Sequence, residues 1–378
     1  MSVRHWLQLA LTDGIGPVLA RRLIETAGSP AAACGADAAL LRTVDGVASK
    51  AGKIAASLRA SAGKVDAELA RAASVGATVI CPDDGTYPPL LREIPDPPLV
   101  LYVRGTLEPR DLNAVAIVGS RKCSLYGREQ AERFAALLAG AGFTIVSGGA
   151  RGTDTAAHRG AIMHPAGRTV AVLGSGVDMA YPPENGALFE QLARRGAVIS
   201  EYPMGTPPVA ENFPRRNRVV SGMSRGVLVV EADERSGALI TARQAADDHN
   251  RPVFAIPGRV DNKLSFGPHM LIRDGATLVT KLEDILDDLG PLPAATLDEP
   301  AATDVPPEPA APAVAPPLRL TDVQRQIVEQ LGHGPVTVDA LVDATGLDPG
   351  TILRELTVLS LRGAVRRVEG QRFALGRK

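Results

Sequence analysis

Three short apolar segments of this 378-residue chain each end in a glycine-rich turn. The first turn, after AVAIV, contains Gly119, Ser120, Arg121 and Lys122. The other two contain Ser147, Gly148, Gly149 and Arg151 after FTIV, and Gly174 and Gly176 after TVAVL. Glycine lets backbone N–H groups approach an oxyanion, and the N-terminus of a following helix favours negative charge. The three turns therefore predict a site that binds phosphate groups.

A further cluster of basic residues lies in the segment NFPRRNR. Its candidate ligands are Arg216, Asn217 and Arg218, because arginine can bind phosphate oxygens in a bidentate manner. Together with Arg121 and Arg151 they would surround a groove suited to several successive phosphates, whereas a single nucleotide needs fewer arginines. The residues therefore favour a polynucleotide as the ligand.

Strand and helix patterns that alternate between residues 76 and 290 must position these turns. β-Branched segments recur at Val198–Ser200, Val227–Glu231 and Val253–Ile256, and a helix is expected near Leu282–Leu289. Such alternation indicates parallel strands joined by right-handed crossovers. We expect an α/β fold with a doubly wound, mostly parallel sheet, whose carboxyl edge collects the turns.

Residues 1–75 form a separate helical pattern, broken by turns at Asp13–Pro17 and Val44–Val47. The pattern predicts a small helical domain. Its glycine turns are typical of helix-hairpin-helix units, which present backbone N–H groups to DNA phosphates. They are equally typical of a helical hairpin that only packs, and both interpretations stay open.

Residues 291–317 are rich in proline and alanine and lack apolar periodicity, which predicts a linker. Residues 318–378 follow as another domain, with helices expected at Thr321–Leu331, Val338–Thr345 and Asp348–Leu361 before a hairpin. This order indicates a winged helix, and the wing carries Arg366, Arg367 and Arg372. Winged helices bind either DNA or a partner protein, and the sequence favours neither use.

Composition narrows the class of protein but not its partner. The chain has 41 basic and 42 acidic side chains, so attraction to a polyanion must come from a local patch. Cys34, Cys81 and Cys123 are isolated, which predicts neither a metal site nor a disulfide framework. No apolar run has the length of a signal peptide or membrane span, so we expect a cytoplasmic protein without membrane contact.

The turns favour a binding protein over an enzyme. A nicotinamide dehydrogenase needs G-x-G-x-x-G and an acidic residue after its second strand, and both are missing. The alternative is a Rossmann-like nucleotide-binding hydrolase of the lysine-decarboxylase-like type, but EADERSGALIT has no carboxylate at the offset of its PGGxGTxxE motif. Helix capping by Asp154, a local hydrogen bond of His158, and orientation of Arg218 or Arg235 by Glu231 explain the remaining titratable groups. We expect no catalytic residue, no metal and no cofactor.

Five segments resemble the DNA-processing protein A family, also called Smf. They are AIVGSRKCSLYG, IVSGGARGTDTAAHRGAI, TVAVLGSGVDMAYPPEN, ISEYPMGTPPVAENFPRRNRVVSGMSRGVLVVEADERSGALITARQA and IPGRVDNKLSFGPHMLIRDGA. The resemblance covers roughly residues 80–285, and the flanking regions match the family layout, with a SAM-like or helix-hairpin-helix-like start. It implies an extended Rossmann-like fold that binds single-stranded DNA, forms a homodimer and passes the strand to the RecA recombinase during natural transformation.

The resemblance also assigns residues to the family's GSR, SGxA and FPxRN motifs. In order, these are Gly119, Ser120 and Arg121; Ser147, Gly148 and Ala150; and Phe213, Pro214, Arg216, Asn217 and the following Arg218. The family's usual YPKEN motif directs a lysine toward the DNA, and Pro183 replaces it here. A phosphate contact is therefore lost or supplied by a neighbour such as Arg151. With 3% aromatic residues, we expect contacts mainly to phosphates, independent of sequence and weakened by salt.

Overall fold

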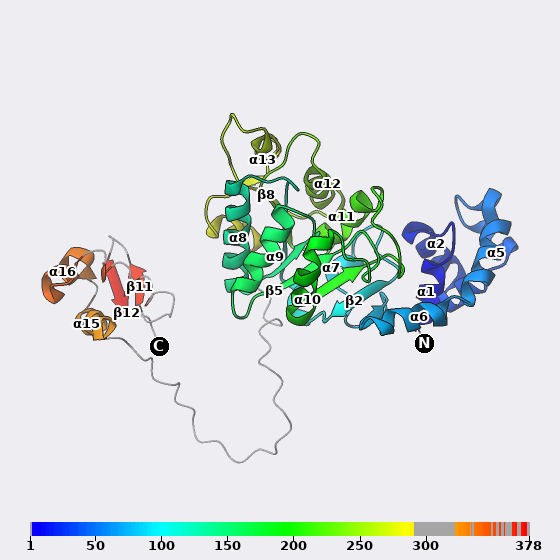
Figure 1. The fold of residues 1–378 in the computed structure, drawn as a ribbon, viewed down its shortest axis with the longest axis horizontal. Helices are drawn as coiled ribbons and strands as arrows, with labels where there is room; N and C mark the ends of the chain where they lie inside the picture. Colours follow the sequence, from blue (N-terminus) through cyan, green and yellow to red (C-terminus); the bar gives the residue numbers. More distant parts are fainter. Residues whose placement is uncertain are drawn as a thin grey trace, which may run out of the picture. The chain divides into compact units, whose positions relative to one another are not determined.

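The computed structural model describes residues 2–290 and, in the carboxy-terminal part, residues 322–332, 334, 336–348, 351–352, 355–356, 359, 365–368 and 372–375. The chain divides into two compact units, residues 1–301 and 302–378. In the first unit, helices precede a nine-stranded sheet that carries further helices on both faces (Figure 1). Among the described residues, no helix combines the length and apolar character needed to cross a bilayer.

The strands of the large sheet are β1 (Ala77–Ile80), β2 (Leu101–Gly105), β3 (Ala114–Val118), β4 (Thr144–Ser147), β5 (Arg168–Val172), β6 (Ala197–Ser200), β7 (Gly226–Val229), β8 (Val253–Ala255) and β9 (Thr277–Leu278). Their order is β1-β2-β6-β5-β4-β3-β7-β8-β9. Along the sheet, the neighbouring strands from β6 through β5, β4, β3, β7 and β8 to β9 are parallel. The pairs β1–β2 and β2–β6 are antiparallel. After β3, the chain adds β4, β5 and β6 on one side of β3. It then returns and adds β7, β8 and β9 on the other side. This confirms the expected doubly wound, mostly parallel sheet, with its switch point between β3 and β7.

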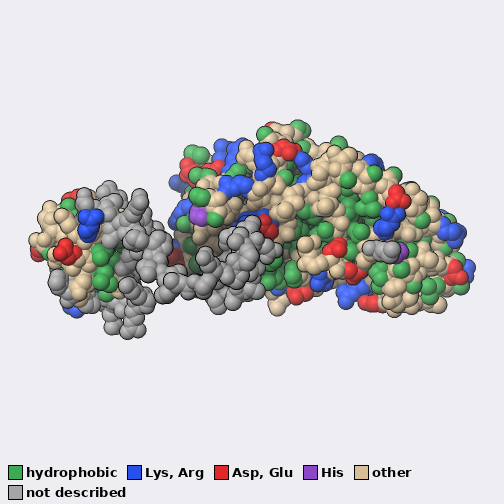
Figure 2. Space-filling view, turned by 90° about the horizontal axis from the view of Figure 1, so that it is seen from below, with side chains coloured by type: hydrophobic (Ala, Val, Ile, Leu, Met, Phe, Trp, Pro, Cys, Tyr) green, Lys and Arg blue, Asp and Glu red, His purple; other side chains and the backbone are tan. Residues whose placement is uncertain are grey.

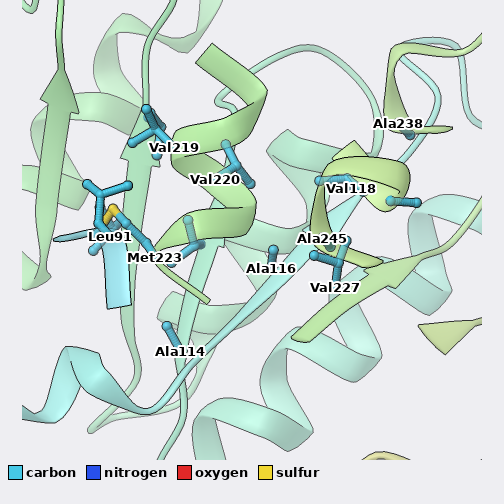
Figure 3. Packing of buried hydrophobic residues seen from close by; sticks show 14 of the residues in the cluster. Leu91, Ala114, Ala116, Val118, Val219, Val220, Met223, Val227, Ala238 and Ala245 are labelled. Carbon is cyan, nitrogen blue, oxygen red and sulfur yellow. The ribbon is translucent and has the colours of Figure 1, made fainter. Parts of the chain in front are cut away.

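The helices between and after these strands are α7 (Pro89–Arg92), α8 (Leu125–Gly140), α9 (Thr153–Met163), α10 (Gly186–Arg195), α11 (Asn212–Gly222), α12 (Gly237–Arg243), α13 (Phe266–Arg273) and α14 (Glu283–Leu289). Every residue of β3 is buried, because helices cover both faces of the sheet. Ile117 packs in the same core cluster as Phe134 of α8. Val118 faces the other way, into a cluster that contains Val220 of α11 (Figure 3). The predicted late helix is confirmed as α14.

Six helices precede the sheet: α1 (Ser2–Ala10), α2 (Pro17–Ala27), α3 (Pro30–Cys34), α4 (Ala38–Thr43), α5 (Ala51–Ala62) and α6 (Val65–Ser74). Both expected breaks are turns, and Gly14 and Gly46 adopt positive φ angles of 88° and 80° there. The helices have a core of their own and share a second cluster with the sheet, in which Leu7 and Val65 contact the region of Tyr102 and Met204. The helical region is therefore anchored on the antiparallel edge of the sheet.

The second unit contains α15 (Asp322–Leu331), α16 (Val338–Thr345) and a three-stranded sheet of β10 (Val336–Thr337), β12 (Arg372–Leu375) and β11 (Val365–Val368). Ile327, Leu341 and Val365 lie in its core. Two helices and the hairpin agree with the predicted winged helix. Most of the third predicted helix, the linker 291–317 and the side chains of Arg366 and Arg367 lie outside the described residues. Arg372 is exposed.

Candidate nucleic-acid interface

A cavity of about 820 Å³ opens at the carboxyl ends of β3 and β4, beside the switch point of the sheet. It is lined by Val118, Gly119, Ser120, Arg121, Lys122, Gly148, Ala150, Asp154, Tyr181, Pro208, Ala210, Phe213, Pro214, Arg216, Asn217, Val220, Asp233, Arg235, Ser236, Gly237, Ala238, Thr241 and Leu264. This volume is in the range of sites that hold nucleotide-sized ligands. Open α/β sheets commonly bind ligands at such a switch point.

The lining is positively charged. It contains four basic side chains (Arg121, Lys122, Arg216 and Arg235) and two acidic ones (Asp154 and Asp233). On the face shown in Figure 2, by contrast, Lys and Arg side chains are interspersed with Asp and Glu. This agrees with the overall balance of charge, so attraction to an anion depends on the cavity itself.

The first turn is held by backbone contacts on both sides. The N–H of Ser120 donates to the carbonyl of Glu231 over 2.7 Å, and the N–H of Thr153 donates to the carbonyl of Ser120 over 3.2 Å. A Cβ atom at Gly119 would lie 2.6 Å from Oγ1 of Thr153, so only glycine fits there. The turn is rigid, and it leaves the side chains of Arg121 and Lys122 exposed at the rim of the cavity.

Arg216 and the second turn form the floor of the cavity. A Cβ atom at Gly148 would lie 1.7 Å from Nη1 of Arg216, so the absence of a side chain makes room for the guanidinium. Arg216 is only 4% exposed. Within residues 2–290, no carboxylate lies within ion-pair distance of Arg216, and its Nε has no hydrogen-bond partner. A buried cation without an ion pair, facing a cavity, is suited to an anionic ligand.

The charges around Arg216 affect one another. Burial lowers the pKa of Arg216 to about 10, although the carboxylate of Asp154 acts in the opposite direction. Burial also raises the pKa of Asp154. The predicted capping role of Asp154 is wrong, because Gly152 precedes the first turn of α9 and Asp154 lies inside it, where its carboxylate accepts from the N–H of Ala150 over 3.2 Å. The cavity floor therefore keeps a positive charge at neutral pH.

Seven of the thirteen predicted binding residues line the cavity: Gly119, Ser120, Arg121, Lys122, Gly148, Arg216 and Asn217. Three others support it from behind. Ser147 is fully buried and donates to the carbonyl of Ile117 over 2.6 Å. Gly149 has a φ of 66°, and its carbonyl accepts from Asn185 over 3.0 Å. A Cβ atom at Gly174 would lie 2.9 Å from the ring of Phe213. These positions shape the walls and are not part of the lining.

Gly176 is not part of the lining, and a Cβ atom there would lie 2.5 Å from Oδ1 of Asp178 and 2.8 Å from the carbonyl oxygen of Pro203. Arg151 lies outside the lining as well. It forms a double contact with Glu184, with Nη2 3.1 Å from Oε2, and its Cζ lies 5.9 Å from the ring centroid of Tyr181. Pro183 is exposed in the 3₁₀ turn that also contains Glu184. Arg151 thus stands next to the position of the missing lysine, at the outer edge of the site.

The expectation that Arg218 shares the groove with Arg216 is wrong. Two positions along a helix differ by about 200°, so these side chains leave α11 on opposite sides. Arg218 is 7% exposed, with Nε 2.8 Å from Asp96 and Nη2 2.6 Å from Glu201. Its charge is already paired and directed away from the cavity.

The expectation that Glu231 orients Arg218 or Arg235 is wrong. Its carboxylate accepts from the backbone N–H of Ser124 over 2.7 Å and from the Ser124 hydroxyl over 2.6 Å. His158 is buried, and its Nδ1 lies 2.7 Å from Oγ1 of Thr169. Both groups therefore have structural contacts. Across the described ranges, no three His, Cys, Asp or Glu side chains group as metal ligands would.

Several cavity residues were not among those predicted from the sequence. The wall opposite the first turn comes from Asp233, Arg235, Ser236 and Gly237, at the start of α12. Ser236 caps this helix, since its hydroxyl accepts from the N–H of Ala238 over 3.3 Å. A Ser-Gly pair after a strand is a helix-start signal, which would have suggested this wall. Pro208 and Ala210 come from a loop with no such signal.

The sheet and cavity define a Rossmann-like protein with a positively charged cavity at the carboxyl ends of its strands. The sequence matches the family model of DNA recombination-mediator protein A over residues 78–290, and a DprA winged helix domain over residues 307–371. The chain belongs to the DNA recombination-mediator protein A family.

Individual relatives agree with this assignment. A protein named Smf from Synechocystis sp. is 35% identical over 98% of both chains. A putative DNA processing protein DprA from Mycobacterium tuberculosis is 38% identical and covers 76% of this chain and 74% of its own. The X-ray structure of DNA processing protein A from Streptococcus pneumoniae is similar with a TM-score of 0.66 and 33% identity, covering 76% of this chain and 98% of that one.

Proposed function

We propose that the cavity binds single-stranded DNA through its phosphates. The observation that carries this proposal is the buried Arg216, which has no ion pair within residues 2–290 and lies against Gly148 below the exposed Arg121 and Lys122. Phosphate oxygens would supply the missing negative charge, and backbone N–H groups of the turns would add contacts. Arg151 lies next to Pro183 and would meet the strand at the edge of the cavity.

The protein acts on DNA by binding and delivery, without catalysing a reaction. Asp154, His158 and Glu231 each have a structural contact that accounts for them. A partner must then use the bound strand, and family membership supports the RecA recombinase in that role, during natural transformation. Such a protein would work in the cytoplasm, where the incoming strand meets RecA.

A homodimer would place two such cavities on one strand. Large apolar side chains are exposed in the segment that runs from the end of β8 to β9: Val260 is 94% exposed, Phe266 is 45% exposed and Leu278 is 46% exposed. Leu271 of α13, by contrast, is 9% exposed and belongs to the core. Light scattering of the full chain should show a dimer that Phe266→Arg shifts toward monomer. A monomer at all concentrations would contradict this part of the proposal.

The proposed domain layout assigns separate tasks. Residues 76–290 would bind the strand, residues 291–317 would serve as a linker, and the winged helix of residues 318–378 would bind a partner or duplex DNA. The helical region 1–75 would support the sheet, with or without DNA contacts at its glycine turns. If so, removal of residues 291–378 should leave affinity for single strands largely unchanged.

A competition titration tests the main proposal. A labelled single strand bound to the full chain is displaced with unlabelled single strand, duplex or mononucleotide at two salt concentrations. Single strands should compete best, and affinity should fall steeply with salt. Tight binding of a mononucleotide followed by its turnover would instead identify the nucleotide hydrolase.

A further inference from the structure

One buried carboxylate connects the N-terminal helices to the α/β sheet. Glu68 of α6 is fully buried. Its Oε1 accepts two hydrogen bonds, from the hydroxyl of Tyr102 over 2.8 Å and from the backbone N–H of Met204 over 2.7 Å. Its Oε2 pairs with Arg71, whose side chain is 60% exposed. Glu68 thus supplies one acceptor atom for two buried donors, on β2 and on the loop after β6.

The loop that contains Met204 is fixed from two sides. Met204 is 5% exposed and belongs to a core cluster with Leu7 and Val65 of the N-terminal helices. On the other side, the N–H of Gly205 donates to the carboxylate of Asp178 over 2.9 Å. The carbonyl of Thr206 also accepts from the N–H of Gly176 over 2.9 Å. The loop therefore lies between α6 and the third glycine turn.

The same loop continues directly into the wall of the cavity. Pro208 and Ala210 line the cavity, four and six residues after Met204. At the end of the loop, the side chain of Asn212 donates to the carbonyl of Gly174 over 2.9 Å. Asn212 is the first residue of α11, which carries Arg216. Pro208 and Ala210 therefore lie between two fixed points, the hydrogen bond to Glu68 and the start of α11. A shift of the loop at Met204 would move this part of the cavity wall.

We propose that Glu68 is a positioning residue for the nucleic-acid cavity, and that it holds the Pro208–Ala210 wall in place from outside the sheet. The significance for DNA rests on the proposed function. Glu68 lies outside the family match, which begins at residue 78. Without this acceptor, the N–H of Met204 and the hydroxyl of Tyr102 would be buried without partners, which favours movement of the loop toward water.

The test uses three variants of Glu68 in the full chain. Glu68→Leu removes the acceptor, and Glu68→Gln retains an Oε1 that can accept both hydrogen bonds. Glu68→Asp keeps the charge, but its side chain is one methylene shorter, so the carboxylate lies further from both donors. This variant replaces Glu68→Leu if the leucine variant does not fold. The control is Leu23→Ala, which opens a cavity in the separate helical core. Hydrogen exchange of residues 202–212 is measured without DNA, and affinity for a single strand is measured at several salt concentrations.

Glu68→Leu should speed exchange at Met204 at least tenfold and weaken binding by about tenfold, with the salt slope unchanged because no phosphate contact is lost. Glu68→Asp should act in the same direction, and Glu68→Gln should stay within about twofold of the wild type. Normal exchange of the loop in both Glu68→Leu and Glu68→Asp would overturn the proposal, as would equal weakening by Leu23→Ala. Absence of binding by the wild type would refute the proposed function alone, since the exchange result needs no DNA.

Discussion

The guanidinium of Arg121 lies over the ring of Phe213, with Cζ 4.8 Å from the ring centroid. The Phe213 ring is 5.6 Å from that of Tyr181, and Cζ of Arg151 lies 5.9 Å from the centroid of the Tyr181 ring. Each ring of this aromatic pair at the edge of the cavity therefore contacts one arginine. A guanidinium stacked on a ring keeps the N–H groups at its edge available for phosphate oxygens. Phe213 thus holds the guanidinium of Arg121 at the edge of the cavity.

Arg121→Ala should weaken binding of single-stranded DNA and reduce the slope of log affinity against log salt by about 0.7 for the lost phosphate contact. Fluorescence anisotropy titrations at four salt concentrations measure both quantities. Arg159→Ala is the matched control, because Arg159 is exposed on α9 and is not part of the cavity lining. An unchanged slope for Arg121→Ala would show that this side chain does not contact a phosphate.

Gly148→Ala should displace Arg216, because the new Cβ would lie 1.7 Å from Nη1 in the present arrangement. We expect DNA affinity to fall by about tenfold or more, since the buried charge leaves the cavity floor. The same anisotropy assay measures the loss, and circular dichroism reports whether the fold is kept. A folded variant with full affinity would argue against Arg216 as a phosphate ligand.

Pro183→Lys restores the basic residue that the family usually carries. The position is exposed in a 3₁₀ turn, so a lysine fits without a change in the core. Affinity for single strands should increase, and the salt slope should become steeper by about 0.7. Pro183→Gln controls for loss of the proline ring and should leave the slope as it is. If lysine and glutamine behave alike, the strand does not pass this side of the cavity.

Gly127→Ala should destabilise the protein, because a Cβ atom there would lie 2.3 Å from Oε2 of Glu231, the carboxylate that holds Ser124 at the start of α8. We expect a loss of roughly 1–3 kcal/mol in the free energy of unfolding, measured with urea. Gly52→Ala in α5 is the control, since no atom of the described residues outside its own helix lies within 4 Å of the added carbon. That change should be neutral or stabilise by up to about 1 kcal/mol.

His158 should make stability depend on pH. Burial, assisted by the nearby charge of Arg216, lowers the pKa of His158 from 6.5 to about 3 in the folded protein. Below pH 6.5 the unfolded chain binds a proton that the folded protein does not, so stability falls as the pH decreases toward 3. The contribution between pH 7.5 and pH 5 is about 2 kcal/mol. Urea unfolding of the wild type and His158→Gln at both pH values measures it, and equal pH dependence of the two proteins would contradict the assignment.

Local patterns were sufficient to predict the fold and the glycine turns. The turns at Gly119 and Gly148 directly follow apolar strands, and this local pattern is visible in the sequence. The contacts that require glycine there come from Thr153 and Arg216, which lie far along the chain. The parallel order of the sheet followed from strands that alternate with helices. In the structure Arg121 and Arg216 line one cavity, the first from the turn after β3 and the second from α11.

The sequence could not separate Arg216 from Arg218. Both are basic residues of one short segment, and the distinction depends on Asp96 and Glu201, which neutralise Arg218 from distant parts of the chain. The contact between Glu68 and Met204 spans 136 positions and leaves no periodic signal. Contacts of buried charged groups with residues far along the chain decide which side chain faces the cavity. A single sequence does not reveal these contacts.

The packing of α6 against the sheet bears on how the protein can be divided for experiments. A recombinant fragment that begins at residue 76 follows the expected domain border, yet it would remove Val65 and Glu68 from contact with Tyr102 and Met204. Such a fragment would expose apolar surface and would tend to aggregate. A fragment that begins at α1 keeps these contacts together with that of Leu7, and is the better choice for studying the sheet without the second unit.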